Sequence, residues 1–355
     1  MNRGSRKLLA IAAVATLVLA ACGGETRGGG DGDQAAGDVR VGVAFDVGGL
    51  GDQSFNDAAN RGLQEAISEG LVTEENTDLI EPNATGSNRD DNVVNLADQG
   101  FDLVLGIGFA FSEGIAEIAA DYPDQKFAVI DGFATTIATD ATNIVDLAFK
   151  EHEGSYLVGI SAAMASQSGT IGFLGGQEGT GLIERFQAGF EAGAQSVNPD
   201  IEILVEYIGD DTTAFNDPTR GEALSAAMYD DGADVVYHAA GGSGAGLFQA
   251  AVAAGPDALA IGVDSDQYLT ASPEQQPHIL TSMLKRVDTA VHDTIEAVAN
   301  DEFEPGFRTF GLAEEGVDYA NSNPDLLTEE MQAAMDEAKQ AIIDGEITVP
   351  EEPSA

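Results

Sequence analysis

The sequence has no tryptophan, a single cysteine and few basic residues. Of its 355 residues, 6% are aromatic and 15 are Lys or Arg, against 61 Asp or Glu, which gives a formal charge of −46. One cysteine excludes an internal disulfide framework and a Cys-rich metal site. The excess of acid excludes a nucleic-acid-binding surface, because such a chain repels polyphosphate. The acids are spread along the chain, which indicates a solvated acidic surface.

The first 22 residues have the pattern of a bacterial lipoprotein signal. Arg3, Arg6 and Lys7 precede the apolar run 8–21, which is too short to span a bilayer comfortably. The run ends in Leu19-Ala-Ala-Cys22, which looks like a lipobox, and Cys22 is the one cysteine of the chain. We expect residues 1–21 to be removed and Cys22 to carry a diacylglyceryl group and an N-terminal acyl group. The alternative is a plain secretory signal with a chance cysteine.

The segment after this signal predicts a lipid-anchored protein. Removal of residues 1–21 leaves 12 Lys and Arg against 61 Asp and Glu, a charge of −49. Residues 22–38 are rich in Gly and acidic residues, which predicts a flexible tether. No later run approaches 18 apolar residues. We therefore expect the protein to lie on the extracytoplasmic face of the cell membrane, anchored to it by lipid.

From residue 38 onward, short apolar runs alternate with helical patterns. Alternation of this kind predicts parallel sheets covered by helices on both faces. Two such sets, over about 39–145 and 149–262, predict two open α/β lobes with a ligand between the carboxyl ends of their strands. The expected strands are 39–45, 103–107, 127–130, 171–174, 201–207, 235–237 and 259–263, and the expected helices are 54–69, 113–121, 151–166, 183–196, 218–230 and 245–254.

The remaining segments set the expected lobe boundaries. We expect an N-terminal lobe of 39–148 with 265–300, so that the strand 279–284 and the helix 287–300 both return to it. The C-terminal lobe is then 149–264 with 301–346, including an amphipathic helix over 325–345. Residues 347–355, rich in Pro and Glu, are expected to be frayed.

An ordered series of motifs over residues 39–310 resembles the basic membrane protein family. Asp46-Val-Gly-Gly-Leu-Gly-Asp-Gln-Ser-Phe-Asn-Asp57 is similar to its opening D-x-G-G-x-x-D-x-S-F-N-[DQ], and the similarity continues through 122–132, 153–159, 172–176, 262–267 and 280–285. The members are lipoproteins that serve as nucleoside receptors of ABC importers. The resemblance implies a type I periplasmic binding protein fold, with two doubly wound lobes joined by a hinge. It also implies an inosine, guanosine or adenosine class ligand, and permease and ATPase partners.

The resemblance assigns several residues to the base. Phe55 matches the residue that stacks on the purine face, and the second stacking aromatic of the family falls near Phe215. Asn56 offers the donor and acceptor that a purine edge requires. Asp131 follows a strand and is expected to accept from a base N–H. Ser54 opens a helix and is a plausible N-cap.

The remaining site residues are expected to face the cleft, most of them the sugar. Asp46 ends the first strand, where it is either a cleft carboxylate or a cap or turn residue. Gly241 and Gly242 begin a glycine-rich loop that allows close backbone approach to the sugar; a phosphate loop is the alternative, but no Walker spacing is present. The resemblance makes Asp264 an acceptor for ribose hydroxyls and Lys285 their donor, with a simple charge partner as the alternative for Lys285.

Two other functions are compatible with the pattern. A sugar receptor of the same fold would need aromatics against a pyranose but no Asn and Asp placed for a base edge. A nucleoside hydrolase would need carboxylates holding a metal that activates water. The four histidines have no ligand spacing, and no nucleophile set is present. We therefore expect a monomeric binding protein without catalytic residues, metal or cofactor.

Overall fold

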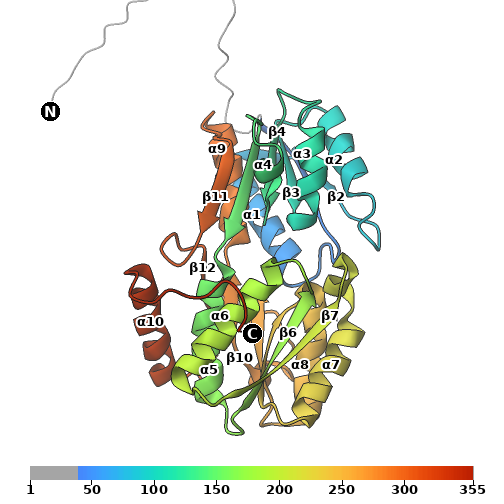
Figure 1. The fold of residues 1–355 in the computed structure, drawn as a ribbon. Coiled ribbons are helices and arrows are strands. Elements are labelled where there is room, and N and C mark those ends of the chain that lie inside the picture. The colour runs from blue at the N-terminus through green and yellow to red at the C-terminus, as the bar shows by residue number, and fades with distance from the viewer. Residues whose placement is uncertain (1–38, 355) are drawn as a thin grey trace, which may run out of the picture. The chain divides into compact units, whose positions relative to one another are not determined.

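The computed structural model describes residues 39–354, which contain two six-stranded sheets (Figure 1). The expected signal peptide, the lipidation site Cys22 and the whole tether lie outside the described residues. The strand order is β11-β5-β4-β3-β1-β2 in the first sheet and β12-β10-β9-β8-β6-β7 in the second. Every pairing is parallel except that between β10 and β12. This is the expected doubly wound α/β architecture.

The first lobe is built on a sheet buried on both faces. Side chains alternate between two cores: Leu103 packs with α1 and α9, while Val104 packs with α2 and α3. Its strands are β1 (Val39–Ala44), β2 (Val72–Ile80), β3 (Leu103–Ile107), β4 (Lys126–Ile130), β5 (Ile144–Phe149) and β11 (Gly306–Phe310). Its helices are α1 (Phe55–Glu69), α2 (Arg89–Asp98), α3 (Ser112–Ile118), α4 (Ala134–Ile137), α9 (Val287–Ala299) and the 3₁₀ turn η1 (Phe109–Phe111).

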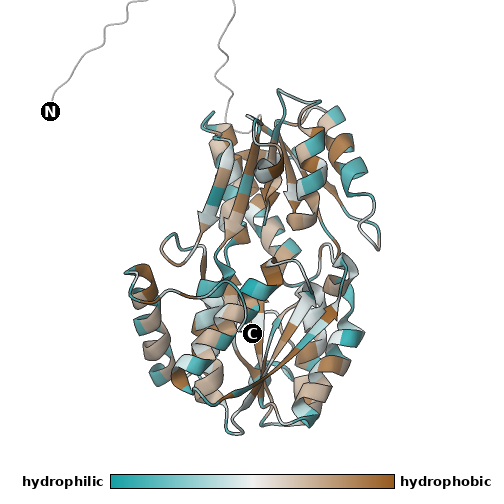
Figure 2. Ribbon diagram, viewed as in Figure 1, coloured by the Kyte–Doolittle hydropathy of each residue, from teal (hydrophilic) through white to brown (hydrophobic). Residues whose placement is uncertain are grey.

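The second lobe repeats this arrangement, and Figure 2 shows hydrophobic strands beneath helices with hydrophilic outer faces. Helices α5 and α6 pack so closely that a side chain at Gly193 would collide with the Tyr156 backbone. Its strands are β6 (Thr170–Gln177), β7 (Glu202–Gly209), β8 (Val235–Ala239), β9 (Leu259–Asp264), β10 (Ile279–Lys285) and β12 (Val317–Tyr319). Its helices are α5 (Glu151–Ala165), α6 (Leu182–Val197), α7 (Pro218–Asp230), α8 (Ala245–Ala254), α10 (Glu329–Ile343) and the 3₁₀ turns η2 (Thr212–Asn216), η3 (Gly241–Gly244) and η4 (Gln276–His278).

The lobe boundaries differ from the expected ones at two strands. Strand β10, expected in the first lobe, pairs with β9 in the second sheet, where Ser282 lies opposite Gly262. Strand β11, expected in the second lobe, pairs with β5 in the first sheet. Only α9 returns to the first lobe as expected, where it packs on α1. An apolar run identifies a strand, but it does not show which sheet receives it.

The C-terminal tail is ordered against the second lobe, so the expectation of a frayed end is wrong for residues 347–354. Val349 is buried in the core, and Ile347 packs against it. The backbone N–H and the hydroxyl of Ser354 donate to Glu191 Oε2 on α6, at 3.3 and 3.0 Å. Ile347 and Val349, together with the hydrogen bonds of Ser354, therefore fix the tail on the second lobe. No helix among residues 39–354 is long and apolar enough to cross a membrane.

Candidate functional site

A cavity of about 70 Å³ lies between the lobes, where the carboxyl ends of the central strands face each other. Nine of the ten residues expected at the ligand line it; Ser54 does not, but it donates a hydrogen bond to Asp264. The lining residues are Asp46, Val47, Asp52, Phe55, Asn56, Gly108, Phe109, Asp131, Leu182, Ile183, Phe186, Phe215, Ala239, Gly241, Gly242, Val263, Asp264 and Lys285. The structure therefore brings together residues that are more than 200 positions apart in the sequence.

The loop between β1 and α1 is organised by Asp52, which was not expected at the site. Its Oδ1 accepts from the backbone N–H of Ser54 and Asp57, at 2.9 and 3.1 Å, and its Oδ2 accepts from the backbone of Asn56 at 2.8 Å. These bonds satisfy orphan amides at the start of α1. The side chain of Ser54 makes no capping bond and points to Asp264 instead. Ser54 occupies the expected N-cap position, but the expectation that its hydroxyl accepts from an orphan amide is wrong, because Asp52 accepts from these amides.

The Asn56 amide is partly used within the same loop. Its Oδ1 accepts from the Asp46 backbone at 3.2 Å, and its Nδ2 donates to Asp52 at 3.0 Å. An amide nitrogen carries two N–H groups, so one remains for a ligand. The Asp46 carboxylate, expected to face the cleft, is paired with Arg89, whose Nε lies 2.6 Å from Asp46 Oδ1. Sequence reasoning did not consider Arg89, which lies on α2 far from any quoted motif.

Aromatic rings from both lobes line the cavity. Phe55 and Phe109 belong to the first lobe, and Phe186 and Phe215 to the second. Phe109 and Phe215 meet edge to face, with ring centroids 6.3 Å apart at 71°. The ring of Phe215 packs over Gly176, where any side chain would collide with it. Phe215 is thus held at the cavity by a glycine on β6.

A buried charge cluster occupies the strand ends near the hinge. Lys285, at the end of β10, lies 2.7 Å from the Asp131 carboxylate and 3.1 Å from Glu151 Oε1. Arg185 adds a bond from Nε to Glu151 Oε2 at 3.0 Å. Lys285 Nζ also lies 5.3 Å from the centre of the Phe55 ring. Lys285 is therefore a charge partner in this structure, the alternative given for it above, and it remains on the cavity wall.

Further hydrogen bonds join the two lobes around the cavity. Beside the bond from Ser54 to Asp264, Gln267 Nε2 donates to the Gln53 backbone carbonyl at 3.2 Å, and Arg89 donates to Thr212 Oγ1 at 2.9 Å. These bonds connect the β1–α1 loop and α2 with the second lobe. The structure thus has the lobes closed on each other at this edge.

The comparisons with known proteins agree with this geometry. Residues 39–353 match the model of the Bmp family, described as ABC transporter substrate-binding protein PnrA-like. The chain belongs to this family. The ABC transporter nucleoside-binding protein BmpA of Lactococcus lactis subsp. cremoris is 32% identical over 97% of this chain and 99% of its own. Basic membrane protein A of Borreliella burgdorferi is 33% identical over 97% and 95%.

Solved structures lead to the same fold. The crystal structure of an ABC transporter solute-binding protein from Aeropyrum pernix K1 matches with a TM-score of 0.74 and 29% identity, over 88% of this chain and 94% of that one. This Bmp family chain is therefore a substrate-binding protein of an ABC transporter. Its expected type I periplasmic binding fold and the resemblance stated above are confirmed.

Burial in the cavity of this Bmp protein raises the pKa of two of its carboxyl groups. Burial raises the pKa of Asp264 to about 6, although Lys285 and the Ser54 hydroxyl oppose the shift. Burial also raises the pKa of Asp131, with Glu151 adding to it and Lys285 opposing it. Burial alone would lower the pKa of Lys285, but Asp131, Glu151 and Asp264 raise it instead. The Lys285 ammonium is therefore stabilised in its charged form, whereas burial disfavours the ionised forms of Asp131 and Asp264.

Two of these carboxyls are held in an uncommon backbone conformation. Asp131 follows β4 with φ of 60°, and Asp264 ends β9 with φ of 64°. Aspartate visits the left-handed region more readily than most residues, but the conformation still costs about 1–3 kcal/mol. Equivalent strand ends in the two sheets thus turn a carboxyl toward the cavity in the same way. Gly241 also has a left-handed φ, of 53°, and packs against the Phe215 backbone.

Several residues in or beside the cavity were not predicted from the sequence. Phe109 follows a strand inside the motif Gly106-Ile-Gly-Phe109, so an aromatic at a strand end could have indicated it. Phe186, Leu182 and Ile183 have the spacing of an ordinary core face on α6, which does not distinguish a cavity wall from a core. Glu151 is fully buried at the first turn of α5, and only the structure shows that it pairs with Lys285.

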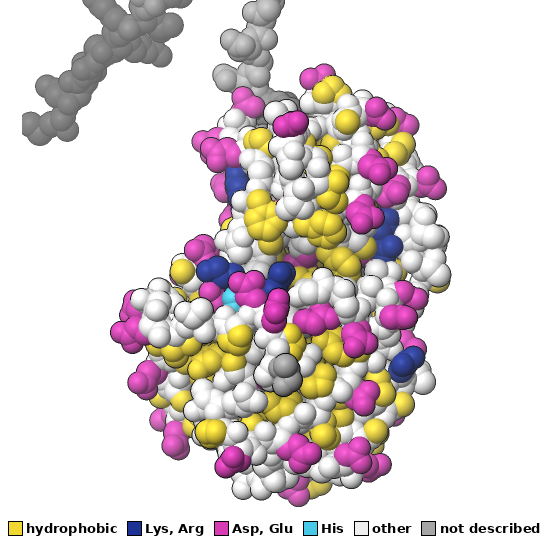
Figure 3. Space-filling view, viewed as in Figure 1, with side chains coloured by type: hydrophobic (Ala, Val, Ile, Leu, Met, Phe, Trp, Pro, Cys, Tyr) yellow, Lys and Arg dark blue, Asp and Glu magenta, His cyan; other side chains and the backbone are white. Residues whose placement is uncertain are grey.

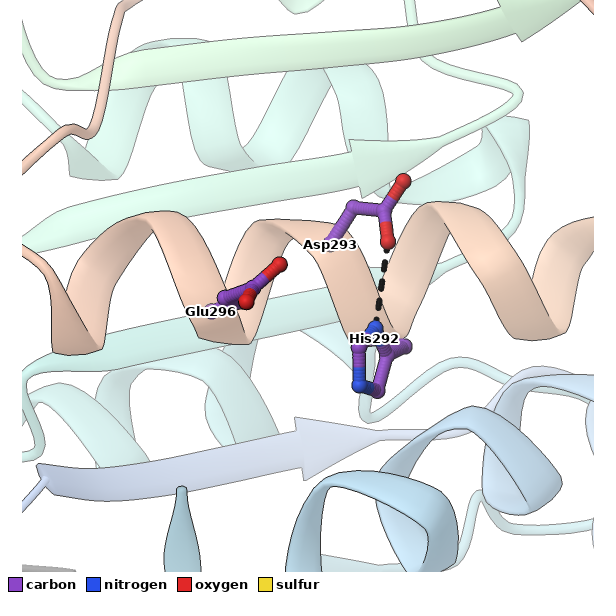
Figure 4. Close-up of side chains that lie close together, drawn as sticks. All are labelled: His292, Asp293 and Glu296. Atoms are coloured by element: carbon purple, nitrogen blue, oxygen red, sulfur yellow. Dashed lines mark hydrogen bonds and ion pairs between the residues drawn. The ribbon is translucent and has the colours of Figure 1, made fainter. Parts of the chain in front are cut away.

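One group with metal-ligand chemistry lies outside the cavity, on α9 (Figure 4). Its members are His292, Asp293 and Glu296. The ring nitrogens of His292 bond to Asp293 at 3.1 Å and to Glu69 on α1 at 3.0 Å. Burial alone would lower the pKa of His292, but these two carboxylates raise it. The arrangement is that of an ion pair joining two surface helices.

Proposed function

We propose that this Bmp family protein captures a purine nucleoside between its lobes and delivers it to an ABC importer. The observation that carries the proposal is the composition of one cavity, where aromatic rings from both lobes meet the Asp131, Asp264 and Lys285 cluster. A flat base needs the rings, and ribose needs hydrogen-bonding groups. The printed name of the Lactococcus lactis relative, a nucleoside-binding protein, supports the same ligand class.

The base would lie among the phenylalanines. Stacking on an aromatic side chain contributes about 1–3 kcal/mol per base. Phe55 and Phe215 come from different lobes, so stacking on both requires the lobes to be closed. A ligand that binds the closed form better shifts the population toward it. The free N–H of Asn56 and the carboxylate of Asp131 are proposed to bind the base edge.

The ribose would join the charge cluster. Lys285 has three N–H donors, and its Nζ donates to Asp131 at 2.7 Å and lies 3.1 Å from Glu151 Oε1. A ribose hydroxyl can accept from a remaining N–H and donate to Asp264, whose only side-chain donor among residues 39–354 is Ser54. Gly241 and Gly242 would let the sugar approach the backbone closely. Asp46, through its pairing with Arg89, would shape the β1–α1 loop at the entrance.

Cellular context completes the proposal. We propose that Cys22 is lipidated after removal of residues 1–21, so that the protein is held on the extracytoplasmic face of the cell membrane. It would act there as a monomer without catalytic activity or cofactor, and its partners would be the permease and ATPase subunits of the importer.

The test is calorimetric titration of the chain from residue 23 onward, which retains the whole compact unit of residues 34–355. Inosine, guanosine and adenosine are titrated beside ribose and glucose. Binding of at least one nucleoside with both sugars silent supports the proposal. Binding of ribose or glucose alone would establish a sugar receptor. Release of free base that stops when chelator is added would establish a nucleoside hydrolase.

A further inference from the structure

The connections between the lobes lie at one edge of both sheets. The chain passes from one lobe to the other after β5, after β10 and after β11. Strands β11 and β5 are neighbours at one end of the first sheet, and β12 and β10 occupy the same end of the second. In Figure 1, β11 and β12 lie on the left, and β2 and β7, which form the opposite edges, lie on the right. Opening about this hinge therefore separates the lobes most on the side of β2 and β7.

Arg89 joins the lobes on that far side. It is the first residue of α2, the helix that follows β2, and its Nη2 donates to Thr212 Oγ1 at 2.9 Å. Thr212 begins η2, the turn that follows β7. The other bonds between the lobes described above run from the β1–α1 loop to Asp264 and Gln267, at and after the end of β9, which lies nearer to the hinge. Of these three contacts, the one made by Arg89 is therefore placed best to resist opening.

The same guanidinium holds Asp46 in the ligand cavity. Its Nε donates to Asp46 Oδ1 at 2.6 Å, and its Nη2 donates to the same oxygen. Asp46 Oδ2 has no hydrogen bond within residues 39–354, so this oxygen is left for a ligand. Burial raises the pKa of Asp46, and the guanidinium opposes this shift, so Arg89 favours the ionised carboxylate, which can only accept hydrogen bonds.

The surroundings of Arg89 fix its position. Its Nη1 donates to the Gly86 carbonyl at 3.0 Å, and a side chain at Gly86, where φ is 68°, would collide with the guanidinium. The Arg89 side chain is only 13% exposed, and hydrogen bonds from a charged donor in such a place are stronger than those between neutral groups. Figure 3 shows several Lys and Arg side chains near the junction of the lobes, whereas Asp and Glu side chains are spread over both.

We propose that Arg89 is a positioning residue that orients Asp46 in the ligand cavity and, through Thr212, holds the lobes closed on the ligand. The inference rests on the proposed nucleoside function. When the lobes open, Thr212 moves away with the second lobe, and Arg89 keeps only its partners in the first. When they close, the bond to Thr212 forms at the mouth of the cleft and slows the reopening that release of the ligand requires. Of the described residues, those that line the cavity do not include Arg89 or Thr212, so neither acts by contact with the ligand.

The experiment measures how fast bound nucleoside leaves full-length protein purified in detergent. Dissociation of tritiated inosine, adenosine and guanosine is followed after a chase with unlabelled nucleoside, and calorimetry gives the affinity, so that the association rate follows from the two.

Two sets of variants are compared in this assay. Thr212→Val removes the hydroxyl and keeps the shape, and Thr212→Ser restores a hydroxyl. Thr213→Val is the matched control, because the hydroxyl of Thr213 donates to Asp211 within its own lobe. Arg89→Gln removes the guanidinium, and Arg220→Gln, at an exposed position on α7, changes the net charge equally.

We expect Thr212→Val to accelerate dissociation about three- to tenfold, because one hydrogen bond from a charged donor is lost, and to change the association rate by less than about twofold. Thr212→Ser should restore the wild-type rate, and Thr213→Val and Arg220→Gln should not change it. Arg89→Gln should accelerate dissociation more than Thr212→Val, by about tenfold or more, because Asp46 also loses its cation.

Two results would overturn the inference and leave the proposed function intact. One is dissociation from Thr212→Val at the wild-type rate, or equal acceleration in Thr213→Val. The other is dissociation from Arg89→Gln that is no faster than from Thr212→Val, since Arg89 would then contribute nothing through Asp46.

Hydrogen exchange separates the two proposals if wild type binds no nucleoside. Exchange of the amides of residues 86–92 in the first lobe is then measured by mass spectrometry in ligand-free wild type, Thr212→Val and Thr213→Val. Faster exchange in Thr212→Val alone would support the contact between the lobes even though the nucleoside function had failed, because the changed residue lies in the other lobe. Equal exchange in all three proteins would reject it.

Discussion

Replacement of Asp264 by Asn should stabilise the protein at neutral pH while it weakens ligand binding. Asp264 is buried, and its pKa rises from 3.8 to about 6. One pKa unit corresponds to about 1.4 kcal/mol, so keeping this carboxyl ionised in the folded state at pH 7 costs about 3 kcal/mol. Asn is uncharged, and its side-chain oxygen can still accept from Ser54. We therefore expect a gain of about 2–3 kcal/mol in the free energy of unfolding.

The pH dependence provides the sharper test. Because the folded pKa lies above the unfolded one, the folded state holds more protons between pH 3.8 and about 6. This group therefore lowers wild-type stability as pH rises through that window, and the stability gain from Asp264→Asn should vanish near pH 4. Urea unfolding at pH 4, 5.5 and 7 measures it. Asp257→Asn is the control, because Asp257 is exposed and its replacement changes net charge equally. A gain that is absent at pH 7, or equally large at pH 4, would refute the reasoning.

Three further perturbations follow from other contacts. Phe55→Ala should weaken nucleoside binding by about 1–3 kcal/mol in calorimetry, because one stacking face is lost, whereas Leu269→Ala, an exposed position, should not change it. Lys285→Met should lower the free energy of unfolding by about 3–5 kcal/mol in urea, since Asp131 is left buried without its cation and Glu151 keeps only Arg185; equal stability would contradict the assigned pairing. His292 has a raised pKa, so its ion pairs stabilise the fold below its unfolded pKa and are lost as pH rises through the folded value. Wild type should therefore lose more stability than His292→Ala between pH 6 and 8, and parallel melting curves would disprove this.

The sequence predicted the elements whose apolar runs are continuous. Strand β3 is buried at every position, and its run 103–107 identified it without ambiguity. Strand β2 was missed because it lies at the sheet edge, and its residues 74–76, Glu, Glu and Asn, are polar. Strand β5 was missed because Asp146 interrupts its run; that carboxylate is buried and accepts from Ala134 and Thr135. Helix α2 carries few apolar residues and escaped notice for the same reason.

The candidate site was predictable where a residue follows a strand, since parallel strands direct their carboxyl ends to one edge. Asp131 was found in this way, the resemblance added Asp264 and Lys285, and all three line the cavity. Their pairing could not be predicted, because Glu151 and Arg185 reach the cluster from helices of the second lobe. The packing of the tail through Val349 was equally hidden, because a tail rich in Pro and Glu has the composition of a solvated end.

The exchange of β10 and β11 between the lobes has a consequence for biogenesis. The first sheet lacks its edge strand until residue 310 has been made, and the second lacks β10 and β12 until residue 319. Helix α9, which covers α1, also comes from this late part of the chain. Neither lobe can therefore finish folding while the ribosome is still synthesising the first three-quarters of the polypeptide. A chain whose sheets are completed late stays unfolded for longer during synthesis, as the export across the membrane proposed above would require.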